Sequence, residues 1–389
     1  MSLLFMMQGL DHEKYEPIVA LIKPSKDLVD LYQSHGFKVV SAPGIGLFAH
    51  TTGGYARLLS FASIRQFFQQ IFKFNRSKRE TLNLIKKTRP DLVHLNSAVL
   101  LPSALALINA ELPFVWHIRE CPPNDGLRTR LIGKAMLKAD HVIYLSEHDR
   151  KAWTKDNHGT VVHNFVDFNR FDRTIDKMKA RKDLGLSETA PQVLYLGAAQ
   201  LIKGFFVLIE AIPLVLRRYP EVRFIMPSAK IYPSNRLIAR TARKILPMVG
   251  TGTAGQRLFK RMAKLGISHA VEMLPFSKDV VRYIAASDVL VFPSTAPHFA
   301  RPVIEASAMA KPVVGSNIGG VNELIDEGKT GLLIPPCNPS ALSDAICRIL
   351  EDPVLAQKMG EEGYEMARQR FCAEKNIMKA QEIYERLLQ

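Results

Sequence analysis

The sequence lacks the features that mark secreted, metal-binding and membrane-spanning proteins. Its four cysteines are far apart and show neither metal-ligand nor redox spacing, so we interpret them as buried or reduced thiols of a cytosolic protein. No basic segment precedes the short apolar run at the N-terminus, which argues against a signal peptide. The longest uncharged stretches, 39–56 and 92–110, are interrupted by proline or polar residues, so no transmembrane segment is predicted.

Acidic residues are missing from one long stretch. Residues 222–271 contain no Asp or Glu, whereas ten Lys and Arg residues lie between 223 and 264. The whole chain has 52 basic and 37 acidic residues, a formal net charge of +15. Such an excess indicates an acidic partner: nucleic acid, a phosphorylated substrate or an anionic membrane.

A second basic segment follows an apolar helical stripe. Apolar residues at helical spacing occupy 64–72, and four basic residues follow directly in 73–79. Two interpretations of 64–79 stay open. It is either a core-facing helix with a solvated basic end, or an interfacial helix on an anionic bilayer.

Short β-branched runs alternate with helical patterns from end to end. This βαβ alternation occurs twice, which predicts an α/β fold of two doubly wound, Rossmann-like domains facing each other across a cleft. The break falls near 164–173, giving a first domain over 1–165 and a second over 166–372. Ligands of such sheets bind beyond the carboxyl ends of the strands. The expected strands are 17–22, 37–41, 91–95, 113–117, 141–145, 160–163, 192–196, 222–226, 271–275, 288–292, 312–315 and 331–334.

The segment 194–204 carries the pattern of a phosphate site. A strand ends at Gly197, a loop follows, and Lys203-Gly204 opens a helix. The amides and dipole of a helix N-terminus beside a lysine favour a diphosphate. A surface lysine at a helix start is the plain alternative.

A second pattern spans 292–323. Pro302 suits the first turn of a helix, which places Glu305 in that turn, near the strand ends. A carboxylate there can accept hydrogen bonds from a vicinal diol such as ribose. The pair Gly319-Gly320 lets backbone approach a phosphate closely before the next helix.

Together these segments resemble the retaining glycosyltransferases of family 4, which have the GT-B fold. The likeness rests on the Lys-Gly helix start, the Lys-Pro-Val-Val run at 311–314 and the Gly-Gly turn, and it covers almost the whole chain. The variant His-Ile-Arg-Glu at 117–120 is similar to members that build bacterial surface polysaccharides. Further similar segments are 89–97, 139–146, 163–167, 288–294 and 328–335.

The resemblance implies transfer of a sugar from a nucleoside-diphosphate donor, with retention and without an obligatory metal. The absence of an Asp-x-Asp motif agrees with metal independence. It implies that Lys203 holds the diphosphate, Glu305 the ribose, and the Gly319 and Gly320 amides the β-phosphate. His117 is expected against the transferred sugar, or else as a core histidine. The implied donor-binding set also includes Gly197, Gly204, His298, Phe299, Ala300 and Arg301.

Three positions depart from the family pattern. The first of two glutamates expected eight positions apart is replaced by Pro297, followed by His298, and the usual arginine after Gly197 is Ala198. We expect either that His298 or the backbone takes over the sugar contact, or that the sugar is recognised in a different way. Arg301 or the basic segment is expected to replace the missing cation.

The start of the chain also departs from the pattern. Family members open with a strand and a Gly-rich loop, whereas residues 1–10 have the pattern of the helix that follows them. We therefore expect the natural chain to begin upstream of Met1. The resemblance also implies that the last helix, within 373–389, crosses back onto the first domain.

The sequence therefore predicts a cytoplasmic glycosyltransferase of polysaccharide biosynthesis. It would be peripheral on the inner face of the cell membrane through 64–79 and 223–264, with a glycan or lipid-linked acceptor. A non-catalytic nucleotide- or sugar-binding relative is the alternative, suggested by Pro297 and Ala198. Nucleic-acid binding is disfavoured because no recognition helix or RNA-binding aromatic motif is present.

Overall fold

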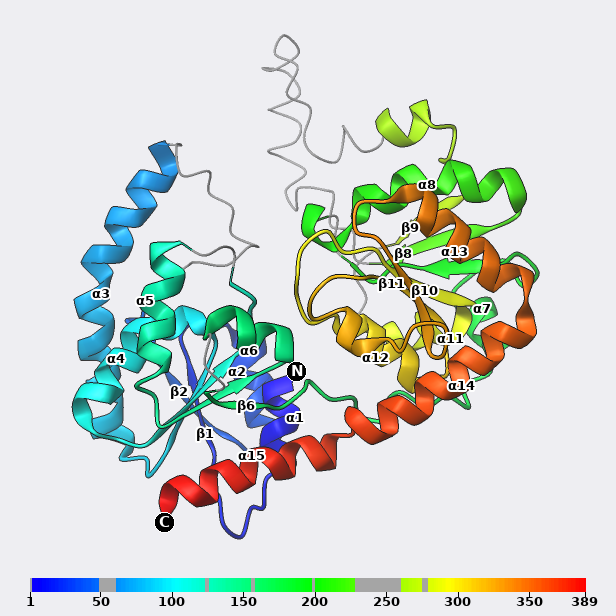
Figure 1. Cartoon of the computed structure of the whole chain (residues 1–389). Coiled ribbons are helices and arrows are strands. Elements are labelled where there is room, and N and C mark those ends of the chain that lie inside the picture. Colours follow the sequence, from blue (N-terminus) through cyan, green and yellow to red (C-terminus); the bar gives the residue numbers. More distant parts are fainter. Residues whose placement is uncertain are drawn as a thin grey trace. The chain divides into compact units, whose positions relative to one another are not determined.

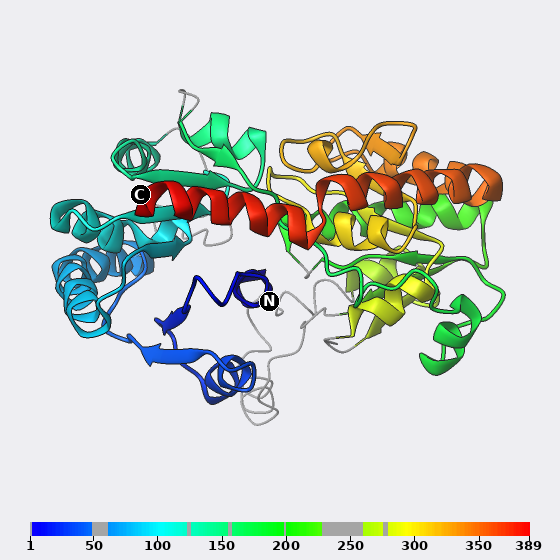
Figure 2. The same cartoon turned by 90° about the horizontal axis from the view of Figure 1, so that it is seen from below.

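The chain folds into two compact units, which are shown in Figures 1 and 2. Unit 1 comprises Met1–Phe165 and Arg370–Gln389, and unit 2 comprises Val166–Gln369. The structure is a computed structural model that describes residues 2–48, 61–122, 126–154, 158–197, 200–227, 260–274 and 279–389. For residues 2, 61–72 and 127 it describes the backbone alone.

Unit 1 alternates strands and helices and closes with the last helix of the chain. Its strands are β1 (Ile18–Leu21), β2 (Lys38–Ser41), β3 (Val93–Asn96), β4 (Phe114–Ile118), β5 (His141–Tyr144) and β6 (Thr160–Val161). Its helices are α1 (Ser2–Gln8), α2 (Lys26–Gln33), α3 (Phe61–Thr88), the short 3-10 helix η2 (Ala98–Leu100), α4 (Leu101–Ala110), α5 (Leu127–Met136), α6 (Glu147–Trp153) and α15 (Ala373–Leu388).

The strands of unit 1 form two parallel sheets in the described part of the chain. β1 pairs with β2, and β3 to β6 pair in sequence order. The register sets Asn96 opposite His117, so His94, two residues earlier on β3, lies on the same face of the sheet as Asn96. Because β4 is buried along its whole length, its polar residues are enclosed with its apolar ones.

Helix α15 packs on one face of the four-stranded sheet, as Figure 2 shows in red. Its apolar side contacts Val115 of β4 and Ile143 of β5, and Met6 of α1 joins the same cluster. This face of unit 1 is therefore completed by residues from both ends of the sequence. The buried residues that α15 contributes are Ile377, Ala380, Ile383 and Tyr384.

Unit 2 carries the second set of alternating elements. Its strands are β7 (Gln192–Leu194), β8 (Arg223–Pro227), β9 (Val271–Leu274), β10 (Val289–Phe292), β11 (Val313–Ser316) and β12 (Gly331–Ile334). Its helices are α7 (Lys177–Asp183), η3 (Leu201–Lys203), α8 (Phe205–Arg218), α11 (Val280–Ala286), α12 (Arg301–Ala308), η4 (Asn322–Leu324), α13 (Pro339–Glu351) and α14 (Pro353–Arg370).

The six strands of unit 2 form one parallel sheet in the order β12-β11-β10-β7-β8-β9. The order reverses direction between β7 and β10, which is the switch point of a doubly wound sheet. The loops that follow these two neighbouring strands leave toward opposite sides. Their first residues therefore lie at the carboxyl edge of the sheet, where ligands of such sheets bind.

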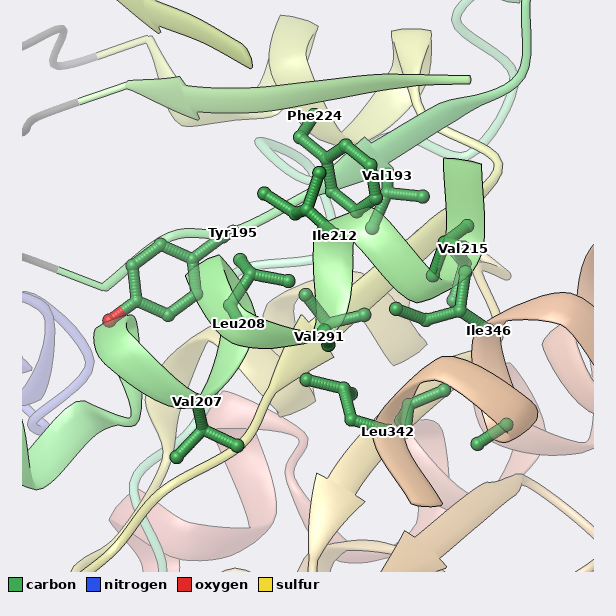
Figure 3. Close-up of a cluster of buried hydrophobic side chains, with 14 of the residues drawn as sticks. Val193, Tyr195, Val207, Leu208, Ile212, Val215, Phe224, Val291, Leu342 and Ile346 are labelled. Carbon is green, nitrogen blue, oxygen red and sulfur yellow. The ribbon is translucent and has the colours of Figure 1, made fainter. Parts of the chain in front are cut away.

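The core of unit 2 lies between the sheet and two helices, α8 and α13 (Figure 3). Leu208 and Ile212 of α8 meet strand residues that include Phe224, and Ile346 of α13 packs beside them. Burial of these side chains fixes α8 on the sheet. The start of α8 is thereby held beside the switch point.

Each of the twelve expected strand segments overlaps a strand, within the residues that the structure describes. The strands of both units pair in parallel, as predicted for two doubly wound domains. One difference is that the described strands of unit 1 form two separate sheets instead of one. The helix expected at 64–79 is part of the longer α3. The side chains of 64–72 and most of the acid-free stretch lie outside the described residues.

Candidate active site

The loops after β7 and β10 are tied together by hydrogen bonds. The hydroxyl of Ser294 donates to the carbonyl of Ile202 at 2.8 Å, and the amide of Thr295 donates to the same carbonyl at 2.9 Å. The Thr295 hydroxyl also donates to the Leu201 carbonyl at 2.8 Å. These bonds fix η3, and with it Lys203, against the loop after β10.

Gly204 is required where η3 turns into α8. Its φ is +76°, and a Cβ at this position would lie 1.6 Å from the carbonyl oxygen of Pro293. Any other residue would combine a left-handed conformation with a backbone clash. Gly197, the other glycine of this loop, lies against the ring of Tyr195, whose hydroxyl donates to the Lys203 carbonyl at 3.2 Å.

Lys203 is a partly buried cation. Burial lowers the pKa of its ammonium group. No carboxylate within the described part of the chain forms an ion pair with it. Desolvation without a counter-ion is unfavourable. An anionic ligand at this position would supply the missing charge.

His298 lies near Lys203 and has one nitrogen without a partner. Its Nδ1 lies 2.9 Å from the Ala296 carbonyl, which can only accept, so this nitrogen carries the proton. Burial, followed by the charge of Lys203, lowers the pKa of His298, although the bond to Ala296 opposes this. The ring is therefore neutral near pH 7. Its Nε2 is a buried acceptor to which no described residue donates.

Glu305 and Arg301 form an ion pair on α12. The Nε of Arg301 donates to Oε1 of Glu305 at 2.7 Å, and the Glu305 residue is 8% exposed. Burial raises the pKa of Glu305, and the charges of Arg301 and Arg170 oppose the rise. From the sequence, Glu305 is expected in the first turn of this helix, and the structure places it one residue beyond that turn. The helix starts at Arg301, so Glu305 is its fifth residue.

The Gly-Gly turn after β11 touches the His298 backbone. Gly320 has φ +80°, and a Cβ there would lie 2.8 Å from the His298 carbonyl oxygen. Within the described residues, the amides of Gly319 and Gly320 donate to no acceptor. Phe299 and the buried Ala300 link this contact to the start of α12.

Nine of the expected donor-site residues thus belong to connected segments of unit 2. They are Gly197, Lys203, Gly204, His298, Phe299, Ala300, Arg301, Gly319 and Gly320, with Glu305 one turn into α12. Ala198 lies outside the described residues. Among the described residues, no group of three or more His, Cys, Asp or Glu side chains is arranged to hold a metal ion.

His117 is the next-to-last residue of the buried strand β4 of unit 1. The residue is 3% exposed, and its Nδ1 lies 3.2 Å from Nε2 of His94. The other nitrogen of His94 lies 2.7 Å from the hydroxyl of Tyr384 on α15. Sequence reasoning assigned no role to His94 or Tyr384. The only available signal was the two-residue periodicity that puts His94 on the face of Asn96, opposite His117.

Of the described residues in the expected basic surface, some bind other protein groups and some are exposed. Arg261 forms an ion pair with Glu210 at 2.5 Å, and Arg223 donates to backbone carbonyls. Lys73, Arg76 and Arg79 on α3 are exposed. None of the helices searched in the described part of the chain combines the length and apolar character needed to cross a membrane.

Two family models match the chain. Residues 27–170 match the model described as Glycosyltransferase Family 4, and residues 176–366 match the model described as Glycosyl transferases group 1. The chain carries the two domains of a GT-B glycosyltransferase. The expected fold class is therefore confirmed.

The sequence is also similar to those of known glycosyltransferases. The D-inositol 3-phosphate glycosyltransferase of Streptomyces avermitilis is 29% identical over 241 residues, which is 59% of this chain and 46% of that protein. The alpha-D-kanosaminyltransferase of Streptomyces kanamyceticus is 27% identical over 50% of this chain and 45% of that protein. The chain thus spans about half the length of the curated relatives it matches.

Solved structures share the fold of these domains. The crystal structure of HepE from Anabaena in complex with UDP has a TM-score of 0.74 at 21% identity. The match covers 99% of this chain and 95% of that chain. At this level of identity the likeness concerns the fold.

Proposed function

We propose that this chain transfers a sugar from a nucleoside-diphosphate sugar to a hydroxyl group of an acceptor. The observation that carries the proposal is Lys203, a desolvated cation with no described counter-ion at the switch point of a doubly wound sheet. An anion with a sugar attached suits this place, because His298, with its unpartnered Nε2, lies close enough to Lys203 for the lysine charge to lower its pKa. The glycosyltransferase activities named for the relatives, and the UDP bound to HepE, agree with this proposal.

We assign the donor nucleotide to three groups of unit 2. Lys203 and the amides at the start of α8 would bind the diphosphate, with the free amides of Gly319 and Gly320 on the β-phosphate. Glu305 would accept hydrogen bonds from the ribose hydroxyls. Its ion pair with Arg301 favours the charged carboxylate that this contact needs and opposes the rise in pKa that burial causes.

His298 would replace the carboxylate that the family pattern places at Pro297. Its free Nε2 accepts a hydrogen bond but adds no negative charge. We therefore expect this site to bind a sugar hydroxyl through a neutral acceptor. A positively charged sugar substituent would gain less here than beside a glutamate.

The reaction would follow from stabilisation of the leaving group. The bond between the anomeric carbon and the β-phosphate oxygen breaks, and its electron pair stays on the diphosphate beside Lys203. The acceptor hydroxyl forms the new bond from the leaving-group face, which retains the configuration, and its proton passes to a phosphate oxygen. Because Lys203 and the backbone amides supply the positive potential, we propose that no metal is obligatory.

We propose that the acceptor is a lipid-linked glycan of a cell-surface polysaccharide, reached from the cytoplasmic face of the membrane. The exposed basic residues of α3 and the net charge of +15 favour an anionic surface or acceptor. The inositol phosphate in the name of the Streptomyces avermitilis relative is likewise an anion.

Binding of UDP, GDP and ADP, measured by thermal shift with and without EDTA, tests the donor site. A ligand at 100 times its dissociation constant adds about 2.7 kcal/mol of stability. We expect one nucleotide to stabilise the wild type, Lys203→Met to abolish most of the shift, and the exposed Lys358→Met to preserve it. Equal shifts in all three proteins would contradict the assignment of Lys203.

Release of nucleoside diphosphate from a panel of nucleotide sugars tests the transfer itself. We expect turnover that depends on an acceptor and continues in EDTA. Donor binding without release, with every acceptor class tried, would instead indicate the non-catalytic relative.

A further inference from the structure

Unit 1 contains a chain of three polar side chains, buried at both ends and half-buried at His94, that ends at a nitrogen without a described partner. Tyr384 of α15 contacts His94 of β3, although 290 residues separate them in sequence, and His94 contacts His117 of β4. Tyr384 is 5% exposed and His117 is 3% exposed. Solvent therefore does not satisfy these groups.

The two contacts are linked by the chemistry of a neutral imidazole, in which one nitrogen donates and the other accepts. Burial, followed by the charge of Arg119, lowers the pKa of His94 to about 4 and that of His117 well below its ordinary value. Both rings are therefore neutral near pH 7. Whether the Tyr384 hydroxyl donates to His94 or accepts from it then decides which nitrogen of His117 carries its proton.

Tyr384 has two possible acceptors for its single hydroxyl proton. Nδ1 of His94 lies at 2.7 Å, whereas the thioether sulfur of Met6 lies at 3.8 Å. An imidazole nitrogen at this short distance is much the better acceptor, because thioether sulfur accepts only weakly. The hydroxyl therefore donates to His94.

The remaining protons follow in order. With Nδ1 of His94 accepting, its proton is on Nε2, which donates to Nδ1 of His117 at 3.2 Å. His117 then carries its own proton on Nε2. That N–H is the group for which the described structure provides no partner.

We propose that Tyr384 and His94 are positioning residues that hold His117 in its Nε2–H tautomer, so that it presents a hydrogen-bond donor to an oxygen of the transferred sugar. This inference rests on the proposed function for the role of His117. The tautomer itself is a property of unit 1 alone. An unmet buried donor is unfavourable, and a sugar oxygen that meets it would be bound in one orientation.

Nitrogen NMR of protein labelled with [15N]histidine reads the tautomer without substrate. The signal of His117 is assigned by its loss in His117→Gln. We expect protonated Nε2 and unprotonated Nδ1 in the wild type, and a mixture of the two tautomers in Tyr384→Phe, which lacks the hydroxyl but keeps the ring. Protonated Nδ1 in the wild type would overturn the proposal.

Tyr15 offers a matched control. Its ring lies edge-on to that of Tyr384 with centroids 6.0 Å apart, but its hydroxyl is not part of the chain of contacts. We expect Tyr15→Phe to leave the tautomer of His117 and the rate of transfer unchanged. A similar change in Tyr15→Phe and Tyr384→Phe would assign the effect to packing and overturn the proposal.

Kinetics then test the use of the tautomer. We expect Tyr384→Phe to lower kcat on the order of tenfold, the lower end of the range for groups that orient a functional histidine. Nucleotide binding, which belongs to unit 2, should not change. His94→Gln, whose amide can still donate to His117, should keep more activity than His94→Leu.

The outcomes separate the two proposals. Turnover by the wild type with unchanged kcat and tautomer in Tyr384→Phe would overturn the inference and leave the proposed function intact. Absence of turnover with every donor would overturn the proposed function, and the NMR signal would still decide whether Tyr384 and His94 set the tautomer.

Discussion

Arg301 donates from Nε to the carboxylate of Glu305, one turn further along α12, at 2.7 Å. The pair sits at an enclosed position, with side chains 26% and 10% exposed. Such a buried pair does not by itself stabilise a protein, since desolvation offsets the attraction. Its effect here is to oppose the rise in the pKa of Glu305 that burial causes.

Arg301→Met should therefore make nucleotide binding more sensitive to pH. Loss of the guanidinium removes a charge that lowers the pKa of Glu305, so the carboxylate takes up a proton at a higher pH than in the wild type. Nucleoside diphosphate affinity should then decline at a higher pH than in the wild type. Titrations between about pH 5.5 and pH 8 measure this. Superimposable pH profiles would show that Arg301 does not control Glu305.

Glu305→Gln tests the ribose contact directly. Loss of a charge-assisted hydrogen bond costs about 1.5–3 kcal/mol, so affinity for a ribonucleoside diphosphate should fall roughly 10- to 100-fold. A 2′,3′-dideoxy nucleoside diphosphate lacks the two hydroxyls, and its weaker binding should be almost unaffected by the substitution. An equal loss for both ligands would place Glu305 elsewhere in the site.

His298→Phe should impair recognition of the sugar more than that of the nucleotide. The ring remains packed beside Phe292, but the acceptor Nε2 is lost. We expect unchanged affinity for the nucleoside diphosphate and a several-fold weaker affinity for the nucleotide sugar. Calorimetry with the two ligands makes the comparison, and parallel losses would argue that His298 only shapes the loop.

Gly204→Ala should be strongly destabilising, and Gly328→Ala supplies its control. Both glycines have positive φ, +76° and +71°, but a Cβ meets Pro293 only at Gly204 and finds open space at Gly328. The left-handed conformation alone costs about 1–2 kcal/mol. Denaturant unfolding should show that loss for Gly328→Ala and a clearly larger one for Gly204→Ala. Equal losses would mean that the loop moves away from Pro293 easily.

Stability should fall as the pH drops from about 6.5 to 4. Burial, with Arg119, lowers the pKa of His94 to about 4, and burial, with Arg386 and His158, lowers that of His141 to about 4. The unfolded chain therefore binds protons that the folded chain excludes, so the stability present above pH 6.5 is lost toward pH 4. For His94 the slope is on the order of 1 kcal/mol per pH unit, and it is smaller for the less buried His141.

His141→Gln measures one share of this slope. Glutamine can keep a hydrogen bond to the Thr160 hydroxyl, which now lies 2.9 Å from Nε2 of His141. Unfolding free energies at about pH 7 and pH 5 should differ less in the variant than in the wild type. A wild type equally stable at both values would contradict the prediction.

The sequence alone was sufficient for the strands and for the residues at the switch point. Runs such as 289–292 are wholly apolar, mostly β-branched or aromatic, and lie between Asp288 and Pro293, and Lys203-Gly204 marks a helix start by local chemistry. These signals are short-range. For Glu305 the expected and observed positions differ slightly. It is the fifth residue of α12 rather than a residue of the first turn, because the helix starts one residue before Pro302.

Contacts between distant segments could not be predicted in the same way. Nothing near Gly204 in the sequence indicates that the Pro293 carbonyl lies against it, and nothing near His94 points to Tyr384. These relationships depend on which strands are neighbours and on where the last helix packs. Strand order and helix docking are set by the sum of many apolar contacts rather than by a local motif.

The position of α15 also determines when unit 1 can finish folding during synthesis. Ile377, Ala380, Ile383 and Tyr384 fill a cluster with Val115 and Ile143, residues that leave the ribosome far earlier. Unit 1 is translated first, yet one face of its sheet stays uncovered until the last helix emerges. Unit 2 has by then been synthesised in full, so the earlier unit is the later one to be completed.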